Sequence, residues 1–193
     1  MYRNHTHLSS LRHTYRNSSR PRVQVECKLN PMFDNEQHIT HDLSRTSLMN
    51  TIFTVGTSNR TTEEFINILK HYGIKVLADV RRFPKSRFVH FNRENLASAC
   101  EIQGIEYRWM GDLFGAFRSE SYEQYCRTGD FKKGLERLEN LAKKRAVALC
   151  CAERLPWKCH RQFIARELEK REWPVTHILD FDTVWQSKQG ELF

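Results

Sequence analysis

One eleven-residue segment of the chain, residues 151–161, concentrates side chains that can do chemistry. It contains two thiols, a carboxylate, an imidazole and two guanidiniums, which belong to Cys151, Glu153, Arg154, Cys159, His160 and Arg161. Thiols serve as nucleophiles, carboxylates and imidazoles serve as general acids or bases, and guanidiniums bind anions. We therefore predict that Cys151, Glu153 and His160 are catalytic, and that Arg154, Cys159 and Arg161 contact the ligand.

Each of these side chains also has a simpler interpretation. A free cysteine at the end of an apolar strand is often a buried core residue, and Cys151 fits that description. As a nucleophile it would need a lowered pKa, which nearby cations or a helix N-terminus could supply. The alternative for Glu153 and His160 is a structural role, in helix capping and in ion pairs. Both interpretations remain open from the sequence.

The spacing disfavours two other kinds of site. A phosphatase- or rhodanese-type anion cradle has an arginine six residues after its cysteine, but the positions in question hold Pro156 and Trp157. A zinc site would recruit Cys151, Cys159 and His160. However, adjacent residues at a helix start diverge by about 100°, and no CxxC or HxxxH spacing supplies a fourth ligand. We therefore predict no metal, and the sequence identifies no cofactor.

The segment lies between a predicted strand and a predicted helix. Residues 145–151 are short, apolar and compatible with a strand, whereas residues 162–171 carry Phe163, Ile164 and Leu168 at helical spacing. In an open α/β sheet this junction lies at the carboxyl edge of the strands. Ligands bind at that edge, and a helix N-terminus there offers free N–H groups to an anion.

Strands and helices alternate along the rest of the chain from residue 51. The patterns predict strands at 51–56, 75–80, 105–110, 145–151 and 175–179, and helices at 61–72, 92–103, 121–144 and 162–171. Such alternation is typical of an α/β fold. We predict a Rossmann-like three-layer domain with a mainly parallel sheet of about five strands, in which right-handed crossovers bring all strand-to-helix loops to one edge.

A second loop at that edge follows the first strand and contains Gly56 and Ser58. A glycine lets the backbone turn sharply, and the hydroxyls of Thr57 and Ser58 could donate to a phosphate or a carbonyl. A turn followed by a helix cap is the alternative. We include Gly56 and Ser58 among the predicted ligand-binding residues.

A third loop follows the second strand. Asp79 ends that strand, and Arg81 points to the same side, so the two could face a ligand or form a buried ion pair. In the same loop, residues 81–91 interleave four cations with phenylalanines, a pattern suited to phosphates and stacked bases. Alternatively, the phenylalanines are in the core and the cations face solvent. We predict ligand contacts for Asp79, Arg81 and Ser86.

Charge and composition restrict the partners and the compartment. The net charge of +8 favours anionic partners, such as nucleotides or nucleic acid. Six cysteines without a recognisable signal peptide indicate free thiols in a reducing compartment. No apolar run approaches the roughly 20 residues that cross a bilayer. We therefore expect a cytoplasmic protein with no membrane association.

The two ends of the chain differ from the middle. Residues 1–48 hold five of the nine histidines and few large aliphatic residues, and the first acidic residue is Glu26. We predict a disordered basic arm at 1–48 and a single α/β domain at 49–193. The arm resembles a transit peptide in composition but is more simply explained as translated upstream sequence. The tail Gln189–Phe193 is similar to peptides that dock onto the sliding clamp, although it could equally pack on the domain.

Several motifs together resemble the family named "domain of unknown function 488". They are Ile52–Arg60, Leu77–Arg81 with Pro84 and Ser86, Gly104–Tyr107, Cys151–Glu153 and Cys159–Arg161. The resemblance implies a compact α/β cytoplasmic protein without an established activity, sometimes labelled as related to DNA repair. It adds Tyr107 to the predicted ligand-binding residues. Thr57 departs from the pattern, because such proteins often have histidine there.

Two functions follow from these patterns. The first is an enzyme that acts on a nucleotide, nucleic acid or other phosphorylated ligand at the carboxyl edge of the sheet. The second is a non-catalytic module that binds nucleic acid or is associated with DNA repair. Burial distinguishes them: Cys151 and Glu153 reachable in a pocket favour catalysis, whereas an open basic surface favours binding.

Overall fold

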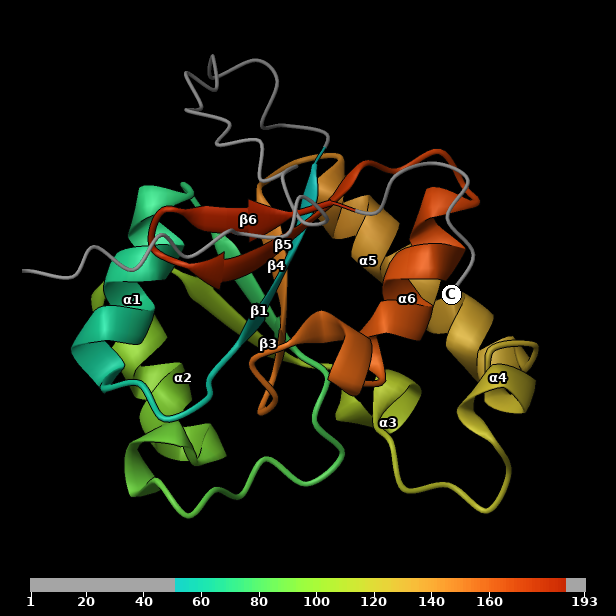
Figure 1. Cartoon of the computed structure of the whole chain (residues 1–193), viewed down its shortest axis with the longest axis horizontal. Coiled ribbons are helices and arrows are strands. Elements are labelled where there is room, and N and C mark those ends of the chain that lie inside the picture. Colours follow the sequence, from blue (N-terminus) through green and yellow to red (C-terminus); the bar gives the residue numbers. More distant parts are fainter. Residues whose placement is uncertain (1–50, 187–193) are drawn as a thin grey trace, which may run out of the picture. The chain divides into compact units, whose positions relative to one another are not determined.

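The computed structural model describes residues 51–186, which form one six-stranded sheet with helices on both faces (Figure 1). The strand order is β3-β2-β4-β1-β5-β6, and β6 alone is antiparallel to its neighbour. The strands are β1 Ile52–Gly56, β2 Val76–Asp79, β3 Glu106–Trp109, β4 Val147–Cys151, β5 Val175–Asp180 and β6 Thr183–Trp185. The predicted arm at 1–48 and the predicted clamp-binding tail Gln189–Phe193 lie outside the described residues.

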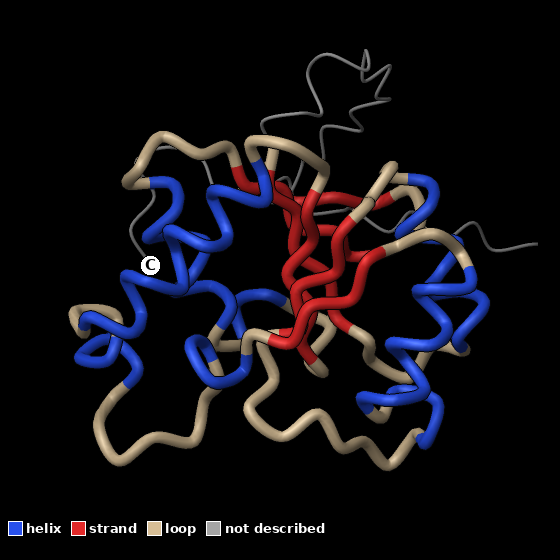
Figure 2. Tube along the Cα trace, turned by 180° about the vertical axis from the view of Figure 1, so that it is seen from behind, coloured by secondary structure: helices blue, strands red, loops and turns tan. Residues whose placement is uncertain are grey.

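The helices cover the sheet in two groups, seen on either side of the strands in Figure 2. One face carries α1 Thr62–His71 and α2 Arg93–Ile102; the other carries α3 Gly111–Phe114, α4 Tyr122–Tyr125, α5 Gly129–Ala142 and α6 Arg161–Glu169. Short 3₁₀ turns are η2 Val89–Phe91 and η3 Pro156–Lys158. The predicted three-layer α/β fold is confirmed, with six strands instead of about five. Within residues 51–186, no helix combines the length and apolarity needed to cross a membrane.

Strand composition explains why the sheet is covered on both sides. All residues of β1 and β4 are buried, and their side chains alternate between two hydrophobic clusters. Ile52 belongs to the cluster under α3–α6, whereas Phe53 and Val55 belong to the cluster under α1 and α2. Continuous apolar strands of this kind are typical of parallel sheets that are buried on both faces.

Helix boundaries follow local signals in the sequence. The predicted capping box at the start of α1 is present, because the Thr61 side chain accepts from the Glu64 amide and the Glu64 carboxylate accepts from the Thr61 amide. The helical stretch predicted at 121–144 is present but is interrupted once, so that it forms α4 and α5. Thr128 is the reason, since its hydroxyl accepts from the Phe131 amide and starts a new helix at Gly129.

The connections place a topological switch point at the carboxyl end of β4. Helices α1 and α2, which follow β1 and β2, lie on one face of the sheet, whereas α6, which follows β4, lies on the other. β4 lies between β1 and β2 in the sheet. The loop after β4 is therefore flanked on both sides by loops that leave toward the opposite face, the arrangement in which open α/β sheets bind ligands.

Candidate functional site

Two thiols and one imidazole converge at the carboxyl end of β4. Cys151 is the last residue of that strand, and Cys159 and His160 precede α6. Nδ1 of His160 lies 3.9 Å from Sγ of Cys151 and 3.7 Å from Sγ of Cys159. The cysteines are only 7% and 6% exposed, and His160 is half-buried. We call Cys151, Cys159 and His160 the thiol–imidazole centre.

The backbone before α6 explains how neighbouring residues reach one point. Pro156 opens the turn η3, and Cys159 follows it in an extended conformation with φ −134° and ψ 146°. His160 has helical dihedral angles. The expectation that adjacent side chains diverge by about 100° holds only where both residues are helical. That argument against a shared ligand is therefore wrong for Cys159 and His160.

The imidazole of His160 is held by its second nitrogen. Its Nε2 lies 3.3 Å from the carbonyl oxygen of Val80, just after β2. A carbonyl only accepts, so Nε2 carries a hydrogen, and Nδ1 is the nitrogen that faces the thiols. The ring also lies against Tyr122, with centroids 5.2 Å apart. The imidazole thus bridges the loops after β2 and β4.

The two thiols of the centre differ in acidity. The pKa of Cys151 lies well below its ordinary value, chiefly because the Cys159 thiol donates a hydrogen bond to it; burial acts in the opposite direction, and His160 lowers the pKa further. The same hydrogen bond, together with burial, raises the pKa of Cys159. Cys151 is therefore the thiol that ionises first. Its neighbour Cys150 is fully buried, burial raises its pKa, and it faces the opposite core cluster.

Arg161 holds the loop that follows β4. It is fully buried, and its guanidinium donates to the carbonyl oxygens of Glu153 and Arg154 and to the hydroxyl of Thr54. All three acceptors belong to the protein, so we assign Arg161 to the scaffold of the loop. Glu153 is exposed, accepts from the Arg154 amide and lies outside the thiol–imidazole centre.

The loop after β1 continues the pairing of β1 with the chain after β4. The amides of Thr57 and Ser58 donate to the carbonyls of Cys151 (2.8 Å) and Ala152 (2.9 Å). A Cβ atom at Gly56 would overlap the carbonyl group of Glu153. Gly56 therefore permits the close approach of two backbones. The hydroxyl of Ser58 donates to its neighbour Asn59.

The loop after β2 is organised by a buried polar cluster. The carboxylate of Asp79, which is fully buried, accepts from Arg81 (Nη2 at 2.6 Å) and from the hydroxyl of Tyr107 (2.6 Å). Arg81 also donates to the carbonyl of Phe91. The hydroxyl of Ser86 accepts from a main-chain amide two residues later. The structure thus has the buried Asp–Arg pair that the sequence left as one of two alternatives.

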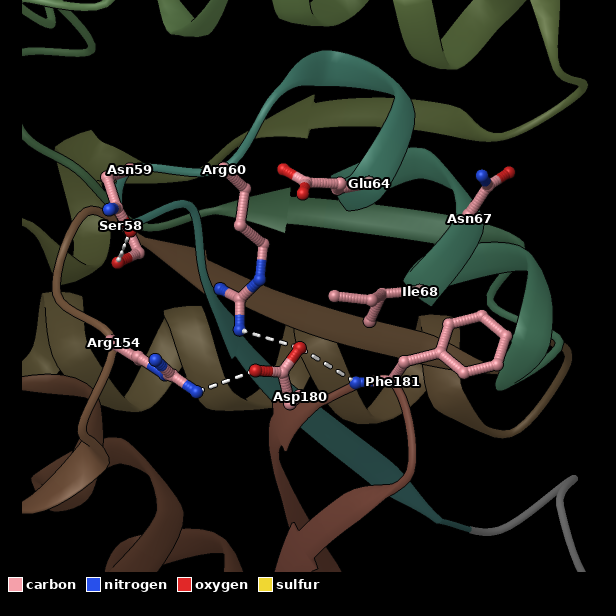
Figure 3. Close-up of a pocket in the computed structure, with 9 residues that line it drawn as sticks. All are labelled: Ser58, Asn59, Arg60, Glu64, Asn67, Ile68, Arg154, Asp180 and Phe181. Atoms are coloured by element: carbon pink, nitrogen blue, oxygen red, sulfur yellow. Dashed lines mark hydrogen bonds and ion pairs between the residues drawn. The ribbon is translucent and has the colours of Figure 1, made fainter. Parts of the chain in front are cut away.

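A cleft of about 460 Å³ lies between the loops after β1, β4 and β5 (Figure 3). The guanidiniums of Arg60 and Arg154 point toward Asp180, with Nη2 of Arg154 2.6 Å from Oδ2 and Nη2 of Arg60 3.8 Å from Oδ1. The lining is Ser58, Asn59, Arg60, Glu64, Asn67, Ile68, Arg154, Asp180 and Phe181. Its two carboxylates balance its two guanidiniums. None of the three residues of the thiol–imidazole centre lines this cleft. The cleft is therefore not a pocket around Cys151 of the kind that would favour catalysis.

The sequence predicted ligand contacts for Arg154 and Ser58, which do line the cleft, but not for Arg60 or Asp180. Arg60 donates to the carbonyls of Gly56 (2.7 Å) and Leu179 (2.5 Å) and so joins the ends of β1 and β5. Its only sequence signal is its position directly before the helix cap. Pairing with a carbonyl on β5 depends on the strand order and could not be predicted from spacing.

Exposed aromatic and basic side chains form a separate surface on the loops after β2 and α3. Phe83 is 66% exposed and Phe117 is 85% exposed, and a Cβ atom at Gly115 would overlap Arg82, so the two loops pack together. We define the aromatic–basic surface as Phe83, Phe117, Arg82, Lys85 and Arg87. Of the phenylalanines predicted to interleave with cations, Phe91 is in the core, Phe88 is half-buried and only Phe83 is open. Phe117 carried no sequence signal.

A family model described as "Domain of unknown function DUF488" matches residues 61–168 of the chain. The chain belongs to the DUF488 family. The match contains the thiol–imidazole centre, the Asp79–Arg81 pair and the aromatic–basic surface, whereas Gly56 and Ser58 precede it. No curated protein and no solved structure matches the chain significantly. Membership in DUF488 assigns no activity, so a function has to be argued from the site.

Proposed function

We propose that the protein is an enzyme that acts on a nucleic-acid or nucleotide ligand at the carboxyl edge of its sheet. One observation supports this most strongly. The aromatic–basic surface begins at Arg82, two residues after Val80, whose carbonyl contacts His160 of the thiol–imidazole centre. A surface suited to nucleic acid and a group of reactive side chains therefore meet at the loop after β2.

The aromatic–basic surface has the two features that hold single-stranded nucleic acid. Exposed aromatic rings stack with bases, which contributes about 1–3 kcal/mol per base, and cations neutralise the phosphates between them. Phe83 and Phe117 are largely exposed, and Arg82, Lys85 and Arg87 belong to the same loop as Phe83. The net charge of +8 adds long-range attraction for an anionic strand.

The thiol–imidazole centre supplies the chemical part of the proposal. A thiol in contact with an imidazole is a common pairing in nucleophilic and acid–base catalysis, and Cys151 and His160 form one. Glu153 is exposed two residues beyond Cys151, where its carboxylate could exchange a proton with solvent or ligand.

A second candidate is a non-catalytic module that binds nucleic acid. It is favoured by the contrast in exposure: Cys151 and Cys159 are almost fully buried, whereas Phe83 and Phe117 are open. Both candidates need the same ligand and differ only in whether that ligand is changed.

Binding is tested first, by fluorescence anisotropy of a labelled single-stranded oligonucleotide with the full chain. We expect Phe83→Ala and Phe117→Ala each to raise Kd by about 5- to 150-fold, the equivalent of one lost stacking interaction. Added salt should weaken binding because cations contact phosphates. Phe181→Ala is the control, since this phenylalanine is also exposed but lines the separate cleft. Equal Kd values for all three variants and the wild type would refute the proposed surface.

Catalysis is tested next by mass spectrometry of the oligonucleotide, and of nucleoside triphosphates, after incubation with the protein. An enzyme should form product that Cys151→Ser and His160→Gln abolish while Kd stays near the wild-type value. Unchanged ligand after long incubation, combined with tight binding, would favour the non-catalytic module instead.

A further inference from the structure

We infer that the thiol–imidazole centre binds one Zn²⁺ ion through Cys151, Cys159 and His160, with the fourth coordination position open to solvent or ligand. These are the three residues whose donor atoms all lie within 4.8 Å of one another. The inference deepens the proposed function, because it assigns the reactive centre of the same edge. Zinc binding itself does not depend on the proposed function; only the role of the open coordination position in catalysis rests on it.

The distances in the centre are close to those of a zinc site. A tetrahedral Zn²⁺ with bonds of about 2.3 Å to sulfur and about 2.0–2.1 Å to nitrogen holds each sulfur about 3.5 Å from the nitrogen. The observed separations from Nδ1 of His160 are 3.9 Å to Cys151 and 3.7 Å to Cys159. These two separations need shifts of a few tenths of an ångström. The two sulfurs lie within 4.8 Å of each other and would stand about 3.8 Å apart on the ion, an approach of up to about 1 Å that side-chain torsions allow.

The second nitrogen of His160 provides independent support. A histidine that binds a metal usually donates its other N–H to a carbonyl or carboxylate, which fixes the ring and selects the free nitrogen. Nε2 of His160 lies 3.3 Å from the carbonyl oxygen of Val80, and Nδ1 faces the two thiols. The outer partner and the inner nitrogen are thus both in the places that zinc coordination requires.

The backbone holds the three donors in place from several directions. The Cys151 carbonyl accepts from the Thr57 amide, and the Cys159 amide donates to the Pro156 carbonyl. Arg161, fully buried, ties down the loop between the two cysteines through its carbonyls. A binding site that is already ordered loses little conformational entropy when an ion enters.

The donor set selects the class of ion. Two thiols and an imidazole suit Zn²⁺, whereas Mg²⁺ and Ca²⁺ require oxygen ligands, and no carboxylate among residues 51–186 joins the three. Sites with three protein ligands keep a position for water or substrate, as catalytic zinc sites do, whereas structural sites use four. Bound zinc would hold both sulfurs as thiolates, so in the loaded protein Cys151 would act as a ligand.

The experiment uses the full chain, purified with a phosphine reductant and without chelator. Elemental analysis should find about one zinc ion per chain. Replacement by Co²⁺ should give the visible bands of a tetrahedral site and a near-ultraviolet band from thiolate to metal charge transfer. Cys151→Ser, Cys159→Ser and His160→Gln should each lower zinc affinity by about 100-fold or more, given that loss of an outer partner alone costs about 10- to 100-fold.

Two matched variants control for other thiols and imidazoles. Cys126→Ser and His71→Gln remove residues outside the centre and should keep zinc and the Co²⁺ spectrum. Cys27 and the histidines of residues 1–48 stay in every variant, so metal bound there would persist in all of them. His160→Gln changes a half-buried side chain, and its circular dichroism should match the wild type, which keeps the test valid if a cysteine variant unfolds.

Three results would overturn the inference. They are a reduced wild-type protein without zinc and without the charge-transfer band, zinc retained equally in all three ligand variants, or a Cys151–Cys159 disulfide recovered after thiols are trapped during lysis. None of these measurements contains nucleic acid. Zinc bound without oligonucleotide binding would therefore refute the proposed function alone, and oligonucleotide binding without zinc would refute the metal site alone.

Discussion

Removing the buried guanidinium of Arg161 should destabilise the protein strongly. Arg161→Met keeps an unbranched side chain of similar length in the core but removes every donor to the loop after β4. The carbonyl oxygens of Glu153 and Arg154 (2.6 Å for the latter) and the hydroxyl of Thr54 (3.3 Å) would all lose a charged partner. These acceptors would have to find water or shift.

The contacts set the size of the effect. A hydrogen bond to a charged group contributes about 1.5–3 kcal/mol, and the 3.3 Å contact with Thr54 adds little, so two bonds give about 3–6 kcal/mol. Glu153 and Arg154 are exposed residues, so water can reach their carbonyls once the loop relaxes. We therefore expect the lower part of that range, about 3–4 kcal/mol, against a total stability of about 5–15 kcal/mol for a typical domain.

Urea denaturation followed by circular dichroism measures this loss, and an unchanged m-value would show that the unfolded states are comparable. Arg166→Met is the matched control on the same helix. That arginine is half-buried, with a 3.4 Å contact to Gln162 and a position over the Phe163 ring, so we expect a loss under about 1 kcal/mol. Equal losses for the two variants would refute the scaffold role of Arg161.

Three further perturbations, again followed by urea denaturation, test two strand ends at the carboxyl edge and a buried histidine within β5. Gly56→Ala would place a methyl group against the backbone of the loop after β4 and should lower the free energy of unfolding by about 1–3 kcal/mol. Gly129→Ala is the control, because a methyl group there meets open space and should leave stability unchanged or raise it. Equal effects of the two variants would contradict the close approach of the two backbones at Gly56. Asp79→Asn leaves the buried cation of Arg81 without its carboxylate and should lower the free energy of unfolding by about 3–5 kcal/mol. A loss below about 1 kcal/mol would mean that the pair is solvated and not buried. Burial, with a nearby guanidinium, lowers the pKa of His177 to about 3 from 6.5. The folded state therefore disfavours the protonated ring, so the contribution of His177 to stability is fully present above pH 6.5 and is lost as the pH falls toward 3. At pH 4.5 the free energy of unfolding should be lower by about 2–3 kcal/mol for this reason. His177→Asn should remove this part of the dependence of stability on pH.

The layers of the fold were predictable because most strands and helices carry a local signal. The capping box at Thr61 and the apolar runs at 147–151 and 175–180 mark elements that the structure contains. The prediction failed where a side chain competes with the helix, as Thr128 does between α4 and α5. It also missed β6, since Thr183–Trp185 is three residues long and is stabilised mainly by pairing with β5. Long-range pairing of that kind leaves no periodic pattern in the sequence.

The candidate site was predictable in its residue types but not in its geometry. Clustering of Cys151, Cys159 and His160 in one loop was visible, and the structure brings them together. What the sequence could not give is the extended backbone at Cys159, which turns its thiol toward its neighbour's imidazole. The partner of that imidazole, Val80, lies 80 residues earlier and becomes adjacent only because β2 and β4 are neighbours in the sheet.

The arginines show how burial changes the interpretation of a conspicuous charge. Arg60, Arg81 and Arg161 each donate to main-chain carbonyls of the loops at the carboxyl edge, and all three are buried. A guanidinium has five donors in a fixed plane, so one side chain can join two or three segments that a lysine could not. These arginines hold the loops in one arrangement in the absence of any ligand, which under the proposed function would lower the entropy cost of binding. Under that proposal, exposed cations such as Arg87 and Lys85 are the ones left to neutralise the ligand's charge.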